Sequence, residues 1–123
     1  MATSSATRLE LWDVLVADAA GESPLWAAAA LSEDEQRREP VFSVLCEPRF
    51  ALGVETIYEG YLLHFGRARL FSLPDGDTAL LLGDYLYAHG LVRIAATGSV
   101  EAVHDLAELI SLCAQAQIGR AHV

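Results

Sequence analysis

The chain has 123 residues, of which 53% are hydrophobic and 20% charged, and its formal net charge is −9. This length suits one domain with a single core, and the apolar content excludes a disordered chain. The acidic balance excludes nucleic acid and anionic membranes as partners, because phosphate binding needs clustered Lys and Arg. All eight basic residues are Arg, so the chain has no lysine for a Schiff base or a phosphate-binding loop.

Cysteine usage and the N-terminus indicate the compartment. Cys46 and Cys113 have neither a CxxC partner nor the spacing of metal ligands, so we expect two buried thiols in a reducing environment. The start of the chain lacks a basic leader region, and the apolar run Pro24–Leu31 is too short to span a bilayer. These features predict a cytoplasmic protein without a membrane span.

The last six residues, Ile118 to Val123 (IGRAHV), match a translation of the start of a common sequencing-library adapter. We therefore expect a non-native tail at residues 118–123 and leave it out of the fold prediction. Residues 1–117 are expected to form a single helical domain that is truncated at its C-terminal end.

The first half of the chain predicts two helices and some short helical pieces. Apolar residues recur at helical spacing over residues 8–20 and stop at Gly21. Ser23 followed by Pro24 predicts the start of a second, short helix. Ser32 with Glu35 has the spacing of a capping box for another short turn.

The second half gives longer helical patterns. Residues 49–65 form a pattern of about four turns that ends at Gly66. A long helix is predicted to begin at a cap on Asp77 or Thr78 and to end before Gly98.

A last helix follows over residues 100–117, with Ser99 as its cap and Glu101 well placed in its first turn. No segment alternates with a period of two for long enough to form a strand. The sequence therefore predicts an all-α helical bundle.

Four glycines lie inside the two long apolar helices. Gly53 and Gly60 are seven residues apart on one helix, and Gly83 and Gly90 are seven apart on the next. Seven residues are close to two turns, so each pair lies on one stripe. Because a mid-helix glycine costs up to about 1 kcal/mol relative to alanine, we expect a structural reason: the two helices pack closely along these stripes.

Asp84 is the first candidate for chemistry. Its neighbours at helical spacing include Leu80, Leu81 and Tyr87, which predicts a carboxylate on an apolar stripe. A buried charge must be paired or protonated, so Asp84 is either an ion-pair or cap partner or a site acid or metal ligand. The candidate partners are Arg67, Arg69, His64 and His104.

Glu55 and Glu59 lie one turn apart on the preceding helix. Facing Asp84, they could hold Mg²⁺, which prefers hard oxygen ligands. The alternative, which we favour, is a solvated helix face. The candidate polar site thus comprises Glu55, Glu59, Asp84, Arg67 and Arg69, with no metal assigned and Mg²⁺ expected only if the site is enzymatic.

The histidines give weaker signals. Glu101 and His104 have the spacing of half a di-iron ligand set, but the second copy that such a set needs is missing. His104 and Glu108 are better interpreted as an exposed pair one turn apart. His64 suits the last turn of its helix, where a cation is favourable. The role of His89 stays open.

One segment resembles a known family. The passage ALLLGDYLYAHGLVRIAATGSVEAVHDLAELISLCAQAQ is similar to the trans-polyprenyl diphosphate synthases, all-α enzymes in which a helix with an A-x-L-x-G-D-x-L pattern ends in a turn of small residues. Gly83-Asp84 would lie on that helix and Gly98-Ser99 in the turn. The resemblance implies an isoprenoid-synthase-like bundle, with Arg67 and Arg69 near the family's arginine-containing loop.

The chain departs from this family at the catalytic motif. The family binds its allylic diphosphate through Mg²⁺ held by a DDxxD motif, and no such motif occurs here. Where it should lie, the chain offers Glu55, Glu59 and His64. The resemblance is therefore closest to the smaller subunit of two-component heptaprenyl diphosphate synthases, which has this fold without the aspartate-rich motifs.

Three functions follow as expectations. The first is a non-catalytic subunit that forms a homo- or hetero-oligomer through apolar helices, notably the region Leu80–Leu91. The second is a helical metal-dependent enzyme with a carboxylate site at Glu55, Glu59 and Asp84. The third is a helical interaction protein unrelated to isoprenoids.

Overall fold

The computed structural model describes the backbone of residues 3–121 and the side chains of residues 11–113, 115 and 116. The predicted all-α class is confirmed: this part of the chain is helical without a strand, and the single β-bridge joins Ala30 to Phe71. Three single-turn 3₁₀ helices, at Glu33–Glu35, Ser43–Leu45 and Pro48–Phe50, lie in the segment between Ala29 and Ala51. The α-helices are α1 (Thr3–Glu22), α2 (Pro24–Ala29), α3 (Ala51–Phe65), α4 (Gly76–Ala95) and α5 (Val100–Ala121).

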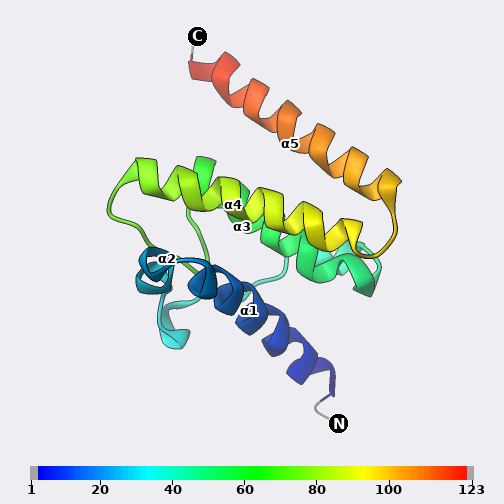
Figure 1. Cartoon of the computed structure of the whole chain (residues 1–123), viewed down its shortest axis with the longest axis horizontal. Coiled ribbons are helices and arrows are strands. Elements are labelled where there is room, and N and C mark those ends of the chain that lie inside the picture. The colour runs from blue at the N-terminus through cyan, green and yellow to red at the C-terminus, as the bar shows by residue number, and fades with distance from the viewer. Residues whose placement is uncertain (1–2, 122–123) are drawn as a thin grey trace.

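The pair formed by α3 and α4 is the centre of the fold. The helices α1 and α2 lie on one side of this pair, and α5 lies along the other side of α4 (Figure 1). The buried core forms between the pair and α1, with contributions from α2 and from the loop before α4. Its members are Trp12, Leu15, Ala19, Ala29, Leu70, Phe71, Leu82 and Leu86.

The four glycines line the contact between α3 and α4, as their spacing predicts. A Cβ built on Gly60 would lie 2.8 Å from the carbonyl oxygen of Gly83, and one built on Gly90 would lie 2.9 Å from that of Gly53. The pairing of Gly53 with Gly90 and of Gly60 with Gly83 also shows that the helices run antiparallel. Glycine is needed here because the backbones approach too closely for any side chain.

The start of α4 differs from the prediction. Asp75, rather than Asp77 or Thr78, is the N-cap: its Oδ1 accepts hydrogen bonds from the Asp77 amide at 2.8 Å and the Thr78 amide at 3.2 Å. Asp75 has the extended backbone of a cap (φ −128°, ψ 137°), whereas Asp77 already lies in the first turn. Sequence alone could not separate these neighbouring polar residues, because the choice depends on the path of the loop.

We expect Asp75→Ala to lower the free energy of unfolding by about 1 kcal/mol, because two amides of α4 lose their acceptor. Asp77→Ala is the matched control. It removes only a favourable charge near the helix N-terminus, worth roughly 0.3 kcal/mol at the surface. Urea denaturation of both variants checks the prediction, and a larger loss for the Asp77 variant would contradict the cap assignment.

Other helix ends agree with the prediction in part. Ser23 caps α2, and its side chain accepts a hydrogen bond from the Leu25 amide. Ser99, which directly precedes α5, accepts a hydrogen bond from the Ala102 amide. The Ser32 hydroxyl instead donates to the Glu35 carboxylate at 2.9 Å, so the capping box is not formed. The helix predicted at residues 8–20 is longer and runs to Glu22.

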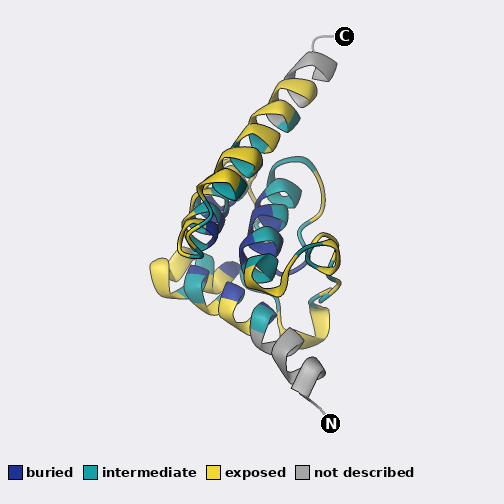
Figure 2. Cartoon of the chain, turned by 90° about the vertical axis from the view of Figure 1, so that its right-hand side faces the viewer, coloured by how far each residue is buried: buried dark blue, intermediate teal, exposed yellow. Residues whose placement is uncertain are grey.

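The last helix contributes none of its described residues to the core. No α5 side chain that the structure describes is buried, and the helix projects beyond the rest of the molecule (Figure 2). The predicted non-native tail, residues 118–123, lies outside the described side chains, although the α5 backbone continues to Ala121. Within the described part, no helix is both long and apolar enough to cross a bilayer.

Candidate functional site

The two glutamates of α3 are buried, which corrects the expectation of a solvated face. Glu55 and Glu59 are both 0% exposed. Their one-turn spacing places both on the side of α3 that meets the loops before α3 and before α4. A carboxylate in this environment must be paired and hydrogen-bonded to stay ionised.

Arg69 is the partner of both glutamates. Its Nε lies 3.0 Å from Oε1 of Glu59, and its Nη1 lies 2.7 Å from Oε1 of Glu55. The guanidinium also donates to two backbone carbonyls, those of Glu39 at 2.8 Å and Glu55 at 3.1 Å. Arg69 itself is only 2% exposed, so the whole group of charges lies inside the molecule.

Two aromatic rings flank the Arg69 guanidinium. Its Cζ lies 4.9 Å from the ring centroid of Trp12 and 5.0 Å from that of Tyr58. Arginine suits this position because its planar cation both stacks on rings and bridges two carboxylates. The side chain therefore joins α1, α3 and the loop that precedes α4.

The remaining carboxylate oxygens accept hydrogen bonds from loop amides. Glu55 Oε2 accepts from the amides of Val41 at 2.8 Å and Ser43 at 3.0 Å. Glu59 Oε2 accepts from the amides of Arg69 at 3.0 Å and Leu70 at 2.9 Å. Each glutamate thus fixes one loop to α3, and neither carboxylate has an oxygen without a hydrogen bond.

These interactions shift the ionisation of Glu55. Burial alone raises the pKa of its carboxyl, but hydrogen bonds from Arg69, Ser43 and Val41 favour the charged form and lower the pKa below its ordinary value. The carboxylate is therefore held ionised, which suits a structural ion pair and not a general acid.

The lowered pKa predicts a loss of stability in acid. A group whose pKa is lower in the folded than in the unfolded state stabilises the fold above the unfolded value, about 4.3 for Glu. This contribution disappears as the pH falls through the folded-state pKa. We expect the free energy of unfolding to fall as the pH drops below about 4.3, and less steeply in Glu55→Gln.

The control for this pH dependence is Glu47→Gln, which alters an exposed glutamate paired with Arg49. In this variant, the free energy of unfolding should fall in acid as much as it does in the unsubstituted chain. The free energy of unfolding is measured by urea denaturation at each pH. If it falls equally steeply with pH in the Glu55 and Glu47 variants, the assignment is contradicted.

Asp84 does not join the glutamates, so the convergence that the alternative of a metal-dependent enzyme requires is not formed. Its side chain is 66% exposed and lies 3.0 Å from Nε2 of His64. The apolar neighbours that predicted burial, Leu80 and Leu81, are themselves exposed. In the described part of the chain, no three His, Cys, Asp or Glu side chains are placed to hold a metal ion.

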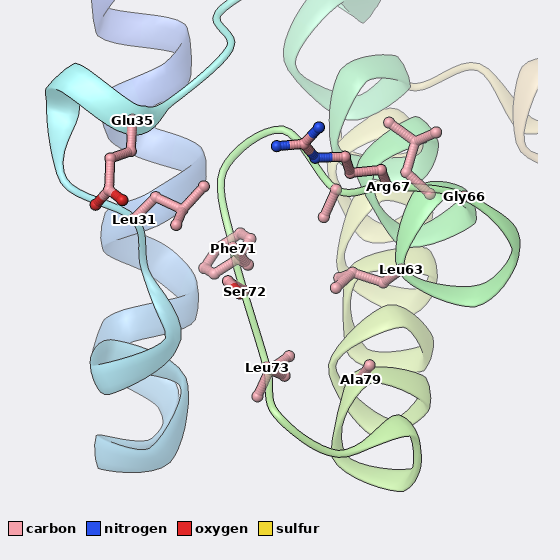
Figure 3. A pocket seen from close by; sticks show the side chains of 11 residues that line it. Leu31, Glu35, Leu63, Gly66, Arg67, Phe71, Ser72, Leu73 and Ala79 are labelled. Atoms are coloured by element: carbon pink, nitrogen blue, oxygen red, sulfur yellow. The ribbon is translucent and has the colours of Figure 1, made fainter.

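Arg67 lies apart from the cluster, beside an open cavity of about 380 Å³. Leu31, Leu63 and Phe71 contribute apolar walls, and Arg67 and Glu35 lie on opposite sides of the loop that carries Phe71 (Figure 3). Arg67 is exposed, so the predicted pair of arginines divides: Arg69 is internal and Arg67 is at the surface.

The structure gives His89 a role that the sequence left open. Its Nε2 lies 3.2 Å from Oδ2 of Asp18 on α1, which also pairs with Arg93. The imidazole stacks on Tyr85, with ring centroids 5.3 Å apart. His89 therefore links α4 to α1.

The exposed pair predicted between His104 and Glu108 is not formed among the described contacts. His104 instead lies 3.6 Å from Asp105.

The region Leu80–Leu91, predicted to meet another subunit, is largely used within the chain. Leu82, Gly83, Leu86 and Gly90 are buried against α3 and the core. Only its outer positions remain accessible, with Leu81 62% exposed. The glycine stripe explains this, because it requires α4 to lie tightly on α3.

Sequence reasoning missed the loop amides of Val41, Ser43 and Leu70 and the ring of Trp12. A signal for the cluster was present: Glu55 and Glu59 are the only acidic residues of α3. Comparison with known proteins adds no assignment, because no family model, curated protein or solved structure matches the chain.

Proposed function

We propose that this chain is a non-catalytic helical component that acts by helix–helix association. It would be similar to the small, aspartate-motif-lacking subunit of two-component heptaprenyl diphosphate synthases. The observation that supports this proposal is the state of the α3 carboxylates. Both accept hydrogen bonds from Arg69 and from loop amides, so neither is free to bind a metal-bound diphosphate.

Two further features support the resemblance. Gly83 and Asp84 lie on a long helix, and a turn at Gly98 (φ 88°) leads into another helix. At the place of the family's first aspartate-rich motif, α3 carries Glu55, Glu59 and His64 instead of paired aspartates. A chain of this kind would keep the helical scaffold and provide a surface for association without catalysing a reaction.

The alternative of a metal-dependent enzyme requires a different arrangement. Arg69 would have to leave both glutamates, and Asp84 would have to turn inward from its contact with His64. Breaking a buried pair by removing its partner costs about 3–5 kcal/mol. An unrelated helical interaction protein would share the association but not the family likeness, and would bind neither diphosphate nor prenyl chains.

Calorimetric titration with an allylic diphosphate, with and without Mg²⁺, tests the non-catalytic assignment. We expect no Mg²⁺-dependent binding and no prenyl transfer when isopentenyl diphosphate is added. Asp84→Asn is a suitable companion variant, because the side chain is exposed and its loss should leave the fold intact. Mg²⁺-dependent binding that this variant abolishes would contradict the proposal and favour the enzyme.

A further inference from the structure

The cavity beside Arg67 lies at the loop between α3 and α4 and is separate from the buried charges around Arg69. Its volume of about 380 Å³ is that of a site for a small molecule. Part of its wall is formed by leucines that are only half-buried, so some of their apolar surface stays accessible. These residues are Leu31, Leu62, Leu63 and Leu73. An apolar group of a ligand would gain free energy by covering them.

Arg67 gives this cavity a cation that has no carboxylate partner among the described side chains. Four other described arginines do form ion pairs with carboxylates, namely Arg38, Arg49, Arg69 and Arg93. Glu35, which also lines the cavity, lies on the opposite side of the loop from Arg67 (Figure 3) and accepts a hydrogen bond from Ser32. Because a guanidinium matches the geometry of a carboxylate, Arg67 suits a ligand with one carboxylate.

The backbone of Phe71 offers a donor and an acceptor at the cavity wall. Phe71 forms an antiparallel bridge with Ala30, and the hydrogen bonds of this bridge come from the residues on either side of the pair. In such a pair, the amide and carbonyl of each residue point away from the partner segment. Among the described contacts, neither group of Phe71 has a hydrogen-bond partner, although the residue is only 2% exposed. Since an unpaired buried peptide group is unfavourable, a ligand with a peptide backbone would satisfy both groups.

The loop is held in place without a ligand. Nη2 of Arg37 donates to the carbonyls of Arg67 at 2.8 Å and Ala68 at 3.2 Å. The amide of Arg37 donates to the carbonyl of Arg69 at 3.0 Å, and Glu59 on α3 accepts from the Arg69 amide. A site that is already ordered loses little conformational entropy on binding.

We propose that this cavity binds a short apolar peptide of two or three residues with a free C-terminal carboxylate. The carboxylate pairs with Arg67, one residue of the peptide pairs with the amide and carbonyl of Phe71, and its apolar side chains pack against Leu63 and Leu73. The peptide runs antiparallel to the loop, because its C-terminal end lies where the loop carries Arg67. A free peptide of this kind is a zwitterion without net charge, so the net charge of −9 does not repel it. This site goes beyond the proposed association and does not depend on it.

A nuclear magnetic resonance titration of the chain with the tripeptide Ala-Val-Leu tests the proposal. We expect saturable binding with a large shift of the Phe71 amide. Arg67→Met should raise the dissociation constant at least about tenfold, because the carboxylate loses its charged donor. Arg49→Met is the matched control and should leave the constant unchanged, since Arg49 is exposed but does not line the cavity. Far-UV circular dichroism checks that both variants keep their helices.

Two altered peptides separate the contacts. The C-terminal amide of Ala-Val-Leu should bind the unsubstituted chain at least about tenfold more weakly than the acid does. Arg67→Met should bind the amide and the acid equally, because both changes remove the same interaction. Methylation of the middle amide nitrogen should weaken binding in both chains, since it removes the donor to the Phe71 carbonyl.

Three results would overturn the proposal. Binding of the amide as tightly as the acid would exclude the pairing with Arg67, and an equal loss in Arg49→Met would show that general charge attraction holds the peptide. An absence of saturable binding at millimolar Ala-Val-Leu would exclude a short peptide as the ligand. The proposed function would stand in each case, because the diphosphate titration tests it separately.

Discussion

Replacing Arg69 with Met is expected to lower the free energy of unfolding by about 3–5 kcal/mol. The substitution keeps an apolar side chain against the ring of Trp12 but leaves two fully buried carboxylates, Glu55 and Glu59, without their cation. It also removes the donors to the carbonyls of Glu39 and Glu55. Chemical denaturation at neutral pH measures the effect.

Arg67→Met is the matched control for this prediction. Arg67 carries the same charge two residues away, but its side chain is exposed. Its loss should change the free energy of unfolding by no more than about 0.5 kcal/mol. If both substitutions cost the same small amount, the buried ion pairs would not hold the loop to α3.

Placing a methyl group on Gly60 is the second substitution with a large expected effect. In Gly60→Ala the new Cβ would meet the Gly83 carbonyl oxygen, a backbone atom that cannot rotate away. We expect α3 and α4 to be forced apart at a cost of about 1–3 kcal/mol. Thermal or urea denaturation, with helicity followed by circular dichroism, gives the measurement.

Gly21→Ala, in α1, provides a control with the opposite expected sign. A Cβ on Gly21 would have nothing within 4 Å, so alanine should stabilise the helix by up to about 1 kcal/mol. A stabilising effect at both positions would show that the glycine stripe is not in tight contact.

The helix pairing was predictable because it is a local property of the sequence. The seven-residue spacing of the glycines is visible in the printed chain, and it identifies the faces of α3 and α4 that meet. Helix starts were less certain where several polar residues adjoin, as around Asp75, because the cap depends on loop conformation.

The predicted burial of the carboxylates was wrong: Asp84 was expected to be buried, and Glu55 and Glu59 were expected to face solvent. Asp84 has apolar neighbours on its own helix, but two of them, Leu80 and Leu81, are exposed. Glu59 is buried because its partners arrive from elsewhere: Arg69 and Leu70 lie ten and eleven residues further along, in a loop. Periodicity within one helix cannot reveal such partners, since they depend on the path of the chain between helices.

Amide hydrogen exchange at Val41, Ser43, Arg69 and Leu70 tests the central claim most directly. These amides lie outside the α-helices, yet each donates to a buried glutamate carboxylate. If Glu55 and Glu59 fix the loops to α3, the four amides should exchange only through the global unfolding that exposes core helix amides. Exchange at the rate of an open loop, slowed by added Mg²⁺, would show that the carboxylates are free to bind metal and would contradict the account.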